Sequence, residues 1–269
     1  MSYEYIRYEV ANRVATITKQ NAEQGFMMSK ELVAEMTQAL REARCDDAVG
    51  VIVIDTEGVH QGAVAVSEAL MSGATTLQTR ETIEMGHKLA DLIESIEKPV
   101  VGVVKVEANG GGFETLMPCD FIICADTATF ANPEVTYGIL PGWGGTQRLA
   151  RMIGWREAQK FFLLGEPIDG KKAAELGVVT ESVPLENVDD CVRSLCEKLL
   201  RVPVQSYGFV KRDLRRVFSM SLPQALDAQI DGLSALMTEG LFAAILAAAA
   251  QGQAPELPEY HRYLGKEYE

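Results

Sequence analysis

Short runs of apolar and polar residues alternate along the first half of the chain and predict strands interleaved with helices. Residues 5–10 (YIRYEV) and 13–19 (RVATITK) are typical of a β-hairpin, and 49–56 (VGVIVIDT) has the continuous apolar run of a buried strand. Between them, residues 29–43 place apolar side chains at helical spacing, with Ser29 as the expected N-cap. The pattern indicates mixed α/β structure.

The pattern continues through a glycine-rich turn. Residues 79–96 have the period of an amphipathic helix, and 100–106 (VVGVVKV) read as a second buried strand. Gly110–Gly112 follow at the expected turn into a short helix, and 121–125 (FIICA) form the next predicted strand. The order is strand, turn, helix, strand.

From about Val188 the pattern is almost wholly helical. We therefore expect an α/β core with the active site over residues 1–200 and a helical oligomerisation region over residues 201–269. The apolar run Leu241–Ala250 is too short to cross a membrane, so we interpret it as a helix buried against a neighbouring subunit.

Composition narrows the choice of partners. The 269 residues are 47% hydrophobic and 23% charged, as in an ordinary globular protein. A net charge of -13 argues against nucleic acid and acidic membranes as partners, and the N-terminus lacks a leader pattern, so we expect a cytoplasmic protein. The five cysteines form no CxxC pair, and no metal site is expected.

The glycine triplet is the first candidate for chemistry. Consecutive glycines let another molecule approach the backbone, where unpaired helical N–H groups suit a negatively charged oxygen. The triplet lacks both the GxGxxG and the P-loop spacing, so phosphate binding is weakly supported. A simple tight turn is the alternative.

Two carboxylates accompany the turn. Glu114 falls in the first turn after the glycines, and Glu134 follows Pro133 in an apolar neighbourhood. Paired acids suit general acid/base catalysis, whereas a helix cap and a solvated loop glutamate are the structural alternatives. The pair alone leaves both interpretations open.

Four motifs together are more specific, and their order and spacing strongly resemble the crotonase family of enoyl-CoA hydratases and isomerases. The motifs are GGGFE, CDFIICADTATFANPEV, GILPGWGGTQRLARMIG and GVVTESV. The resemblance implies a spiral of strand, strand, helix turns whose C-terminal helices build a trimer. A homotrimer or a hexamer of paired trimers is therefore expected.

The resemblance also implies the chemistry. In relatives that hydrate enoyl thioesters, the residues matching Glu114 and Glu134 hold and activate one water. Backbone N–H groups matching Gly111 and Val64 form the oxyanion hole. The implied substrate is a small-molecule acyl thioester or related carbonyl compound, and coenzyme A enters only as part of it.

The chain departs from the family pattern near the expected ligand. The family's Ala-Gly-Ala-Asp loop reads GAVA at Gly62–Ala65, and the tail after Gly240 lacks the usual cations. These changes weaken the coenzyme A assignment, because its phosphates require Lys or Arg. An isomerase, a β-dicarbonyl C–C hydrolase acting on a substrate without coenzyme A, and a catalytically silent or engineered scaffold are the alternatives.

Further substrate-binding candidates surround these residues. His60 lies in the expected oxyanion loop, and Tyr137 and Trp143 flank the turn after Glu134, where either could line an acyl pocket. For each of the three, ordinary packing or solvation is the alternative. The remaining candidates are backbone positions of the two loops: Ala63 and Gly112.

Overall fold

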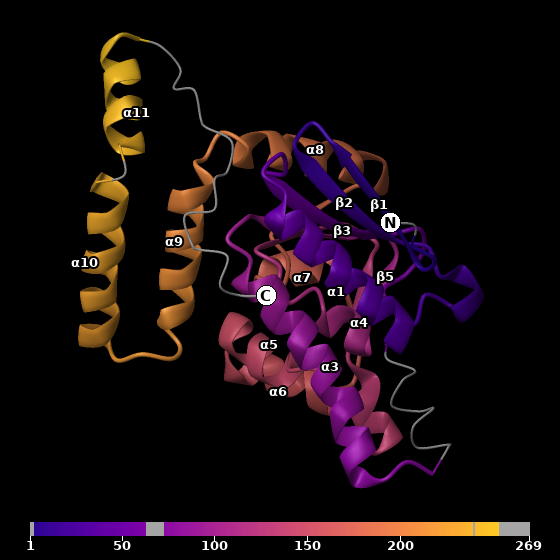
Figure 1. Cartoon of the computed structure of the whole chain (residues 1–269). Helices are drawn as coiled ribbons and strands as arrows, with labels where there is room; N and C mark the ends of the chain where they lie inside the picture. The colour runs from indigo at the N-terminus through magenta and orange to yellow at the C-terminus, as the bar shows by residue number, and fades with distance from the viewer. Residues whose placement is uncertain (1–2, 63–72, 239, 253–269) are drawn as a thin grey trace.

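A largely parallel sheet lies at the centre of the computed structural model, which describes residues 3–62, 73–238 and 240–252 (Figure 1). Its six strands within the described residues run in the order β1-β2-β3-β4-β6-β9. Only β1 and β2 pair antiparallel, as the predicted hairpin. The bounds are β1 Ile6–Ala11, β2 Val14–Lys19, β3 Val51–Thr56, β4 Val100–Val104, β6 Phe121–Ala125 and β9 Glu181–Val183.

A second, smaller sheet carries the segments that lead into the predicted site. It has the order β5-β7-β8, with bounds β5 Glu107–Asn109, β7 Thr129–Ala131 and β8 Ile168–Asp169. The chain leaves β4, adds β5 to the second sheet, forms α4 and returns to β6. The sequence pattern predicted one strand over 100–106, whereas the structure ends β4 at Val104 and starts a strand in another sheet.

Helices surround both sheets and follow the predicted order. Before the last helical region their bounds are α1 Lys30–Cys45, α3 Thr76–Ser95, α4 Gly110–Glu114, α5 Gly145–Ile153, α6 Trp155–Leu164 and α7 Gly170–Leu176. Short 3-10 helices are η1 Ala22–Gln24, η2 Pro133–Tyr137 and η3 Leu185–Asn187. The hydroxyl of Ser29 accepts the N–H of Leu32, which confirms the predicted cap of α1. Helix α3 begins earlier than predicted, because Thr75 and Gln78 form a capping box.

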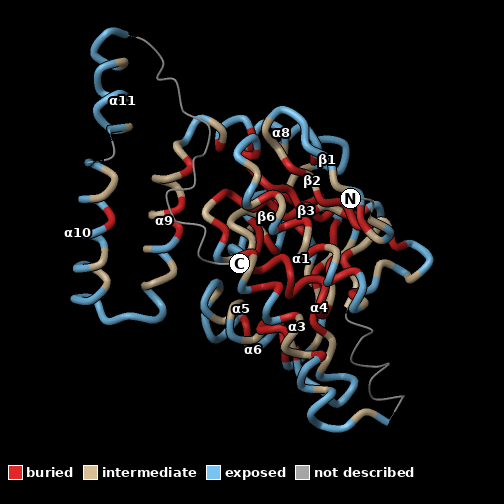
Figure 2. Tube along the Cα trace, in the orientation of Figure 1, coloured by how far each residue is buried: buried red, intermediate tan, exposed pale blue. Residues whose placement is uncertain are grey.

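Buried residues concentrate around the two sheets (Figure 2). The last helices are α8 Val188–Leu199, α9 Val204–Arg216, α10 Leu222–Thr238 and α11 Leu241–Ala250. Helix α8 packs against β4, β6 and β9, whereas α9, α10 and α11 lie to one side of the core. Helix α9 is tied to the core by the buried ion pair of Lys211 with Asp120 at 2.7 Å. The division into a core and an oligomerisation region stays a prediction.

Helices α10 and α11 leave much apolar surface uncovered in the single chain. Side chains of α10 that are exposed are Leu222, Leu226, Ile230, Leu233 and Met237. No single described helix is long and apolar enough to cross a membrane, and α10 and α11 meet that test only as a pair bent by 61°.

Candidate active site

Glu114 is the last residue of α4 and is held inside the protein by the turn that precedes α5. Its side chain is buried, and its Oε1 accepts the N–H groups of Trp143 at 2.9 Å and Gly145 at 2.6 Å. Burial raises the pKa of Glu114 to about 7. The hydrogen bonds from the two backbone amides lower this pKa, and the negative charge of Glu134 raises it further. The carboxyl group can therefore both donate and accept a proton near neutral pH.

Glu134 is carried by η2, directly after β7. Its Oε1 accepts a hydrogen bond from Asn132 Nδ2 at 3.3 Å, whereas its Oε2 is buried without a hydrogen-bond partner among the described residues. Burial raises the pKa of Glu134, with Asn132 and its own backbone opposing. An unpaired buried carboxylate oxygen is costly, and it is available to a water or ligand.

The structure brings the two acids to the same glycine turn. A Cβ placed on Gly110 would lie 2.9 Å from Oε1 of Glu134, so this carboxylate lies against the start of α4, the helix that ends at Glu114. The two are close enough for one charge to raise the pKa of the other. Their catalytic roles stay predictions.

The glycine triplet allows a second loop to pack directly on α4. A Cβ on Gly112 would lie 2.3 Å from the carbonyl oxygens of His60 and Gln61, and Gly110 has a φ of +47°. A Cβ on Gly62 would lie 3.8 Å from the N atom of Gly111. Glycine is therefore required at positions 110 and 112 for the close approach of two backbones, which a tight turn alone would not demand.

Asn109 fixes the contact between these two backbones. Its Oδ1 accepts the N–H of Gly62 at 3.0 Å, and its Nδ2 donates to the carboxylate of Glu107. Gly62 is also the last described residue before the predicted donor Val64 and its neighbour Ala63, which both lie outside the described residues. Sequence analysis missed Asn109, although the Asn-Gly pair marks a special turn.

The aromatic and histidine candidates differ in their surroundings. His60 is 1% exposed, and its Nε2 lies 2.8 Å from the carbonyl oxygen of Val103, with the pKa held well below its ordinary value by burial and by Lys19. Trp143 is equally buried, with its ring packed on Gly86 of α3, whereas Tyr137 is exposed. His60 and Trp143 are therefore packed in the interior of the single chain, as the alternative to a substrate-binding role predicts.

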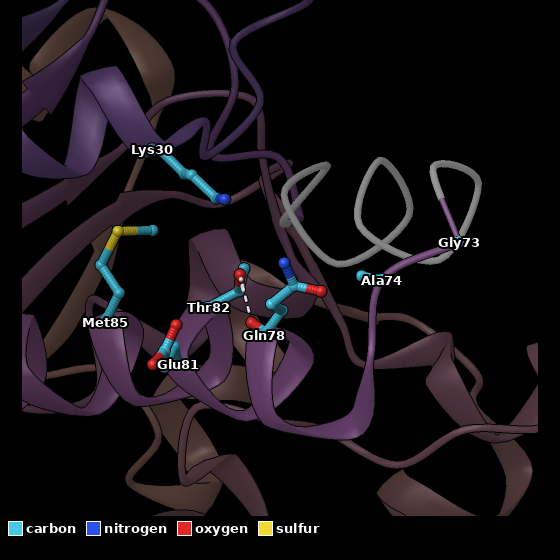
Figure 3. A pocket seen from close by; sticks show the side chains of 7 residues that line it. All are labelled: Lys30, Gly73, Ala74, Gln78, Glu81, Thr82 and Met85. Atoms are coloured by element: carbon cyan, nitrogen blue, oxygen red, sulfur yellow. Dashed lines mark hydrogen bonds between the residues drawn. The ribbon is translucent and has the colours of Figure 1, made fainter.

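Two of the cavities formed by the described residues, beside α3 and beside α9, lie outside the region of Glu114 and Glu134. One, of about 650 Å³, lies between the start of α1 and α3 and is drawn in Figure 3; its lining residues are Lys30, Gly73, Ala74, Gln78, Glu81, Thr82 and Met85. The other, of about 1150 Å³, lies between α9 and the core. Its cationic lining residues are Arg148, Arg151, Lys211, Arg212, Arg215 and Arg216. Neither is lined by Glu114 or Glu134.

No group of His, Cys, Asp and Glu side chains in the described residues could hold a metal ion. The described part of the site presents two carboxyl groups beside a turn of backbone amides. Such an arrangement can move protons and stabilise a developing oxyanion.

Comparisons with known proteins identify the family of the chain. A family model described as enoyl-CoA hydratase/isomerase matches residues 9–242. The crotonyl-CoA hydratase of Syntrophomonas wolfei is 32% identical over 200 residues, which cover 74% of this chain and 77% of that protein. The hydroxycinnamoyl-CoA hydratase-lyase of Pseudomonas fluorescens is 29% identical over 245 residues, covering 88% and 89%.

Solved structures confirm the mixed α/β fold expected from the sequence. An enoyl-CoA hydratase from Bacillus anthracis has a TM-score of 0.85 at 23% identity, covering 96% of this chain and 100% of that one. An enoyl-CoA hydratase from a Polaromonas species has a TM-score of 0.87 at 23% identity, covering 93% and 98%.

Proposed function

Because the chain belongs to the enoyl-CoA hydratase/isomerase family, we propose that it is a hydro-lyase that adds water to an α,β-unsaturated acyl thioester. The observation that carries the proposal is the pair of carboxyl groups at one glycine turn: Glu114 is buried, and Glu134 is half-buried with its Oε2 enclosed and unpaired among the described residues. The charge of Glu134 raises the pKa of Glu114. Buried acids that are only partly hydrogen-bonded are costly, and general acid/base catalysis is a function that requires them.

The two acids divide the proton transfers. One carboxylate accepts a proton from the water while the oxygen of that water attacks the β-carbon. The other carboxyl group gives a proton to the α-carbon. Oε1 of Glu114 is occupied by two backbone amides, so its other oxygen is left to handle the proton. The unpaired Oε2 of Glu134 is available to hold the water from the other side.

The thioester carbonyl becomes an enolate in this reaction, and its negative charge requires donors. The N–H of Gly111 is one proposed donor, and Gly112 allows the backbone of His60 and Gln61 to pack against the same turn. The loop that continues from Gly62 through Ala63 to Val64 is proposed to supply the second. The contact of Gly62 with α4 supports this pairing, because it brings the two loops together. Removing one such donor typically costs 10²–10³ in kcat.

We propose a coenzyme A thioester as the substrate and no separate cofactor. The names of the relatives support it, since crotonyl-CoA hydratase and hydroxycinnamoyl-CoA hydratase-lyase both specify a coenzyme A substrate. His60, Tyr137 and Trp143 are proposed only to shape the surroundings of the acyl group. We also propose a cytoplasmic location.

We further propose a homo-oligomer, a trimer or a hexamer. The uncovered apolar side chains of α10 support it, because such a surface favours association. Residues 217–260 contain no Lys or Arg, whereas five arginines and one lysine line the larger cavity beside α9, so these two regions differ in charge, which favours their contact between copies. Light scattering coupled to gel filtration measures the state directly, and a monomer at micromolar concentration contradicts this proposal.

The function is tested by following the loss of the conjugated enoyl thioester absorbance with crotonyl-CoA. We expect turnover by the unmodified protein, and losses of 10²-fold or more in Glu114→Gln and Glu134→Gln. Product analysis distinguishes 3-hydroxyacyl thioester from a shifted double bond, the isomerase outcome. A parallel assay on a cyclic diketone tests the C–C hydrolase alternative, and the absence of a 3-hydroxyacyl thioester product refutes the proposal.

A further inference from the structure

Lys19, the last residue of β2, is a buried lysine. Its side chain is 1% exposed, and its Nζ lies 3.3 Å from the carbonyl oxygen of Val59 and 3.5 Å from that of Phe26. Among the described residues it forms no ion pair within 4 Å, and burial lowers its pKa to about 7. A buried cation without an acidic partner is destabilising by itself.

The other buried lysines have compensation that Lys19 lacks. Lys98 holds the carbonyl oxygens of Ala43 and Asp46 at the end of α1, and neighbouring acids raise its pKa against the effect of burial. Lys211 forms an ion pair with Asp120. A methionine would fill the space of Lys19 without the cost of desolvation, so what the lysine contributes there is its bonds to two carbonyls.

Those two carbonyls belong to different loops. Phe26 lies in the loop between β2 and α1 and has a φ of +58°. Its ring packs directly on Gly58, where an added Cβ would come within 2.3 Å of a ring carbon. Val59 lies in the loop after β3. The N–H of Met28 also donates to the carbonyl oxygen of Gly62, at 3.2 Å. The Nζ of Lys19 therefore links the two loops where they are in contact, because it binds one carbonyl oxygen from each.

The second loop leads directly to the active site. The N–H of Asn109 donates to the carbonyl oxygen of His60 at 2.8 Å, and His60 forms a parallel bridge with Ala108. The backbone of Gly112 packs against the carbonyl oxygens of His60 and Gln61. A shift of residues 59–62 is therefore transmitted to the first turn of α4.

We propose that Lys19 is a positioning residue of the active site, whose amine holds the loops of Phe26 and Val59 together and thereby sets the backbone at Gly111. The inference rests on the proposed function, in which the N–H of Gly111 binds the enolate oxygen. Lys19 itself does not touch the substrate. It acts through residues 59–62, and His60 is the titratable side chain whose pKa it lowers.

The test compares Lys19→Met with Lys98→Met, which removes a buried lysine that also binds two carbonyls but lies at the far end of α1. With crotonyl-CoA, we expect Lys19→Met to lower kcat 10- to 100-fold with KM changed less than threefold, because the enolate exists only after binding. Its Tm should not fall, since a desolvated charge is removed. Lys98→Met should lower Tm and keep kcat within threefold.

Hydrogen exchange provides a readout that is independent of turnover. In Lys19→Met, we expect faster amide exchange in residues 57–62 and unchanged exchange in β3; in Lys98→Met, faster exchange around residues 43–48 only. Unchanged exchange in residues 57–62, or an unchanged kcat despite faster exchange, overturns the proposal. An inactive unmodified protein refutes the proposed function instead, and the exchange result then still decides whether Lys19 joins the loops.

Discussion

Replacing Glu114 by glutamine should separate catalysis from stability, because the carboxyl group is unfavourable in its ionised form. Its folded pKa of about 7 lies above the ordinary 4.5. The folded protein therefore binds this proton more tightly than the unfolded chain does. The stability that this carboxyl group contributes is fully present below pH 4.5, is lost as the pH rises from about 4.5 to 7, and stays lost at higher pH.

The magnitude follows from the same shift. At 1.36 kcal/mol for each pKa unit, the rise corresponds to about 3 kcal/mol lost above pH 7, of which less than about 1 is already lost at pH 5. The side-chain carbonyl of glutamine can still accept the N–H groups of Trp143 and Gly145, although its amide needs a new partner, at a cost of about 1–3 kcal/mol at any pH. The informative quantity is therefore how much the difference in unfolding free energy between the variant and the unmodified protein changes from low to high pH.

Urea unfolding of both proteins at pH 5 and pH 8, at one protein concentration, measures that difference. We expect Glu114→Gln to gain about 2–3 kcal/mol relative to the unmodified protein between pH 5 and pH 8, while turnover falls 10²-fold or more. Glu157→Gln, at an exposed position on α6, is the matched control and should show no such change. A stability difference that is the same at both pH values refutes the assignment of a raised pKa, and full activity refutes the mechanism.

Three other substitutions test separate parts of the structure. Gly112→Ala should lower stability by about 1–3 kcal/mol and kcat at least 10-fold, because its Cβ would lie 2.3 Å from two backbone carbonyl oxygens. In the control Gly142→Ala the nearest atom is 3.9 Å away, so its Tm should be unchanged. Asn109→Leu should lower kcat at least 10-fold. Asn109→Asp combined with Glu107→Gln keeps the acceptor for the N–H of Gly62 and lets residue 107 donate to residue 109, so it should lose less; equal losses contradict the role of Asn109 in holding the two backbones together. Asp120→Asn should cost about 3–5 kcal/mol in urea unfolding, because it leaves Lys211 buried without its partner, while kcat in the folded fraction stays unchanged.

Local signals predicted most of the elements. Apolar period located the bodies of α1 and α3, and Ser29 located the start of α1, because helical hydrogen bonds and caps involve residues within about four positions. The start of α3 was predicted too late, because the capping box of Thr75 and Gln78 was missed. The same reasoning failed at β5, where a continuous apolar and polar run is divided between two sheets. No periodicity within the run marks that change, since it depends on which strands are available for pairing.

The sequence by itself determined the α/β class, the glycine triplet and the two acids as candidates for proton transfer. Only the tertiary structure decided that Glu114 is buried by a turn 29–31 residues further along the chain, and that Glu134 lies against Gly110. It also placed the Nζ of Lys19 between the carbonyl oxygens of Phe26 and Val59, which lie in loops remote from each other in sequence. The physical reason is that burial and electrostatic coupling depend on distances in space, and packing of the sheets sets these distances between residues remote in sequence.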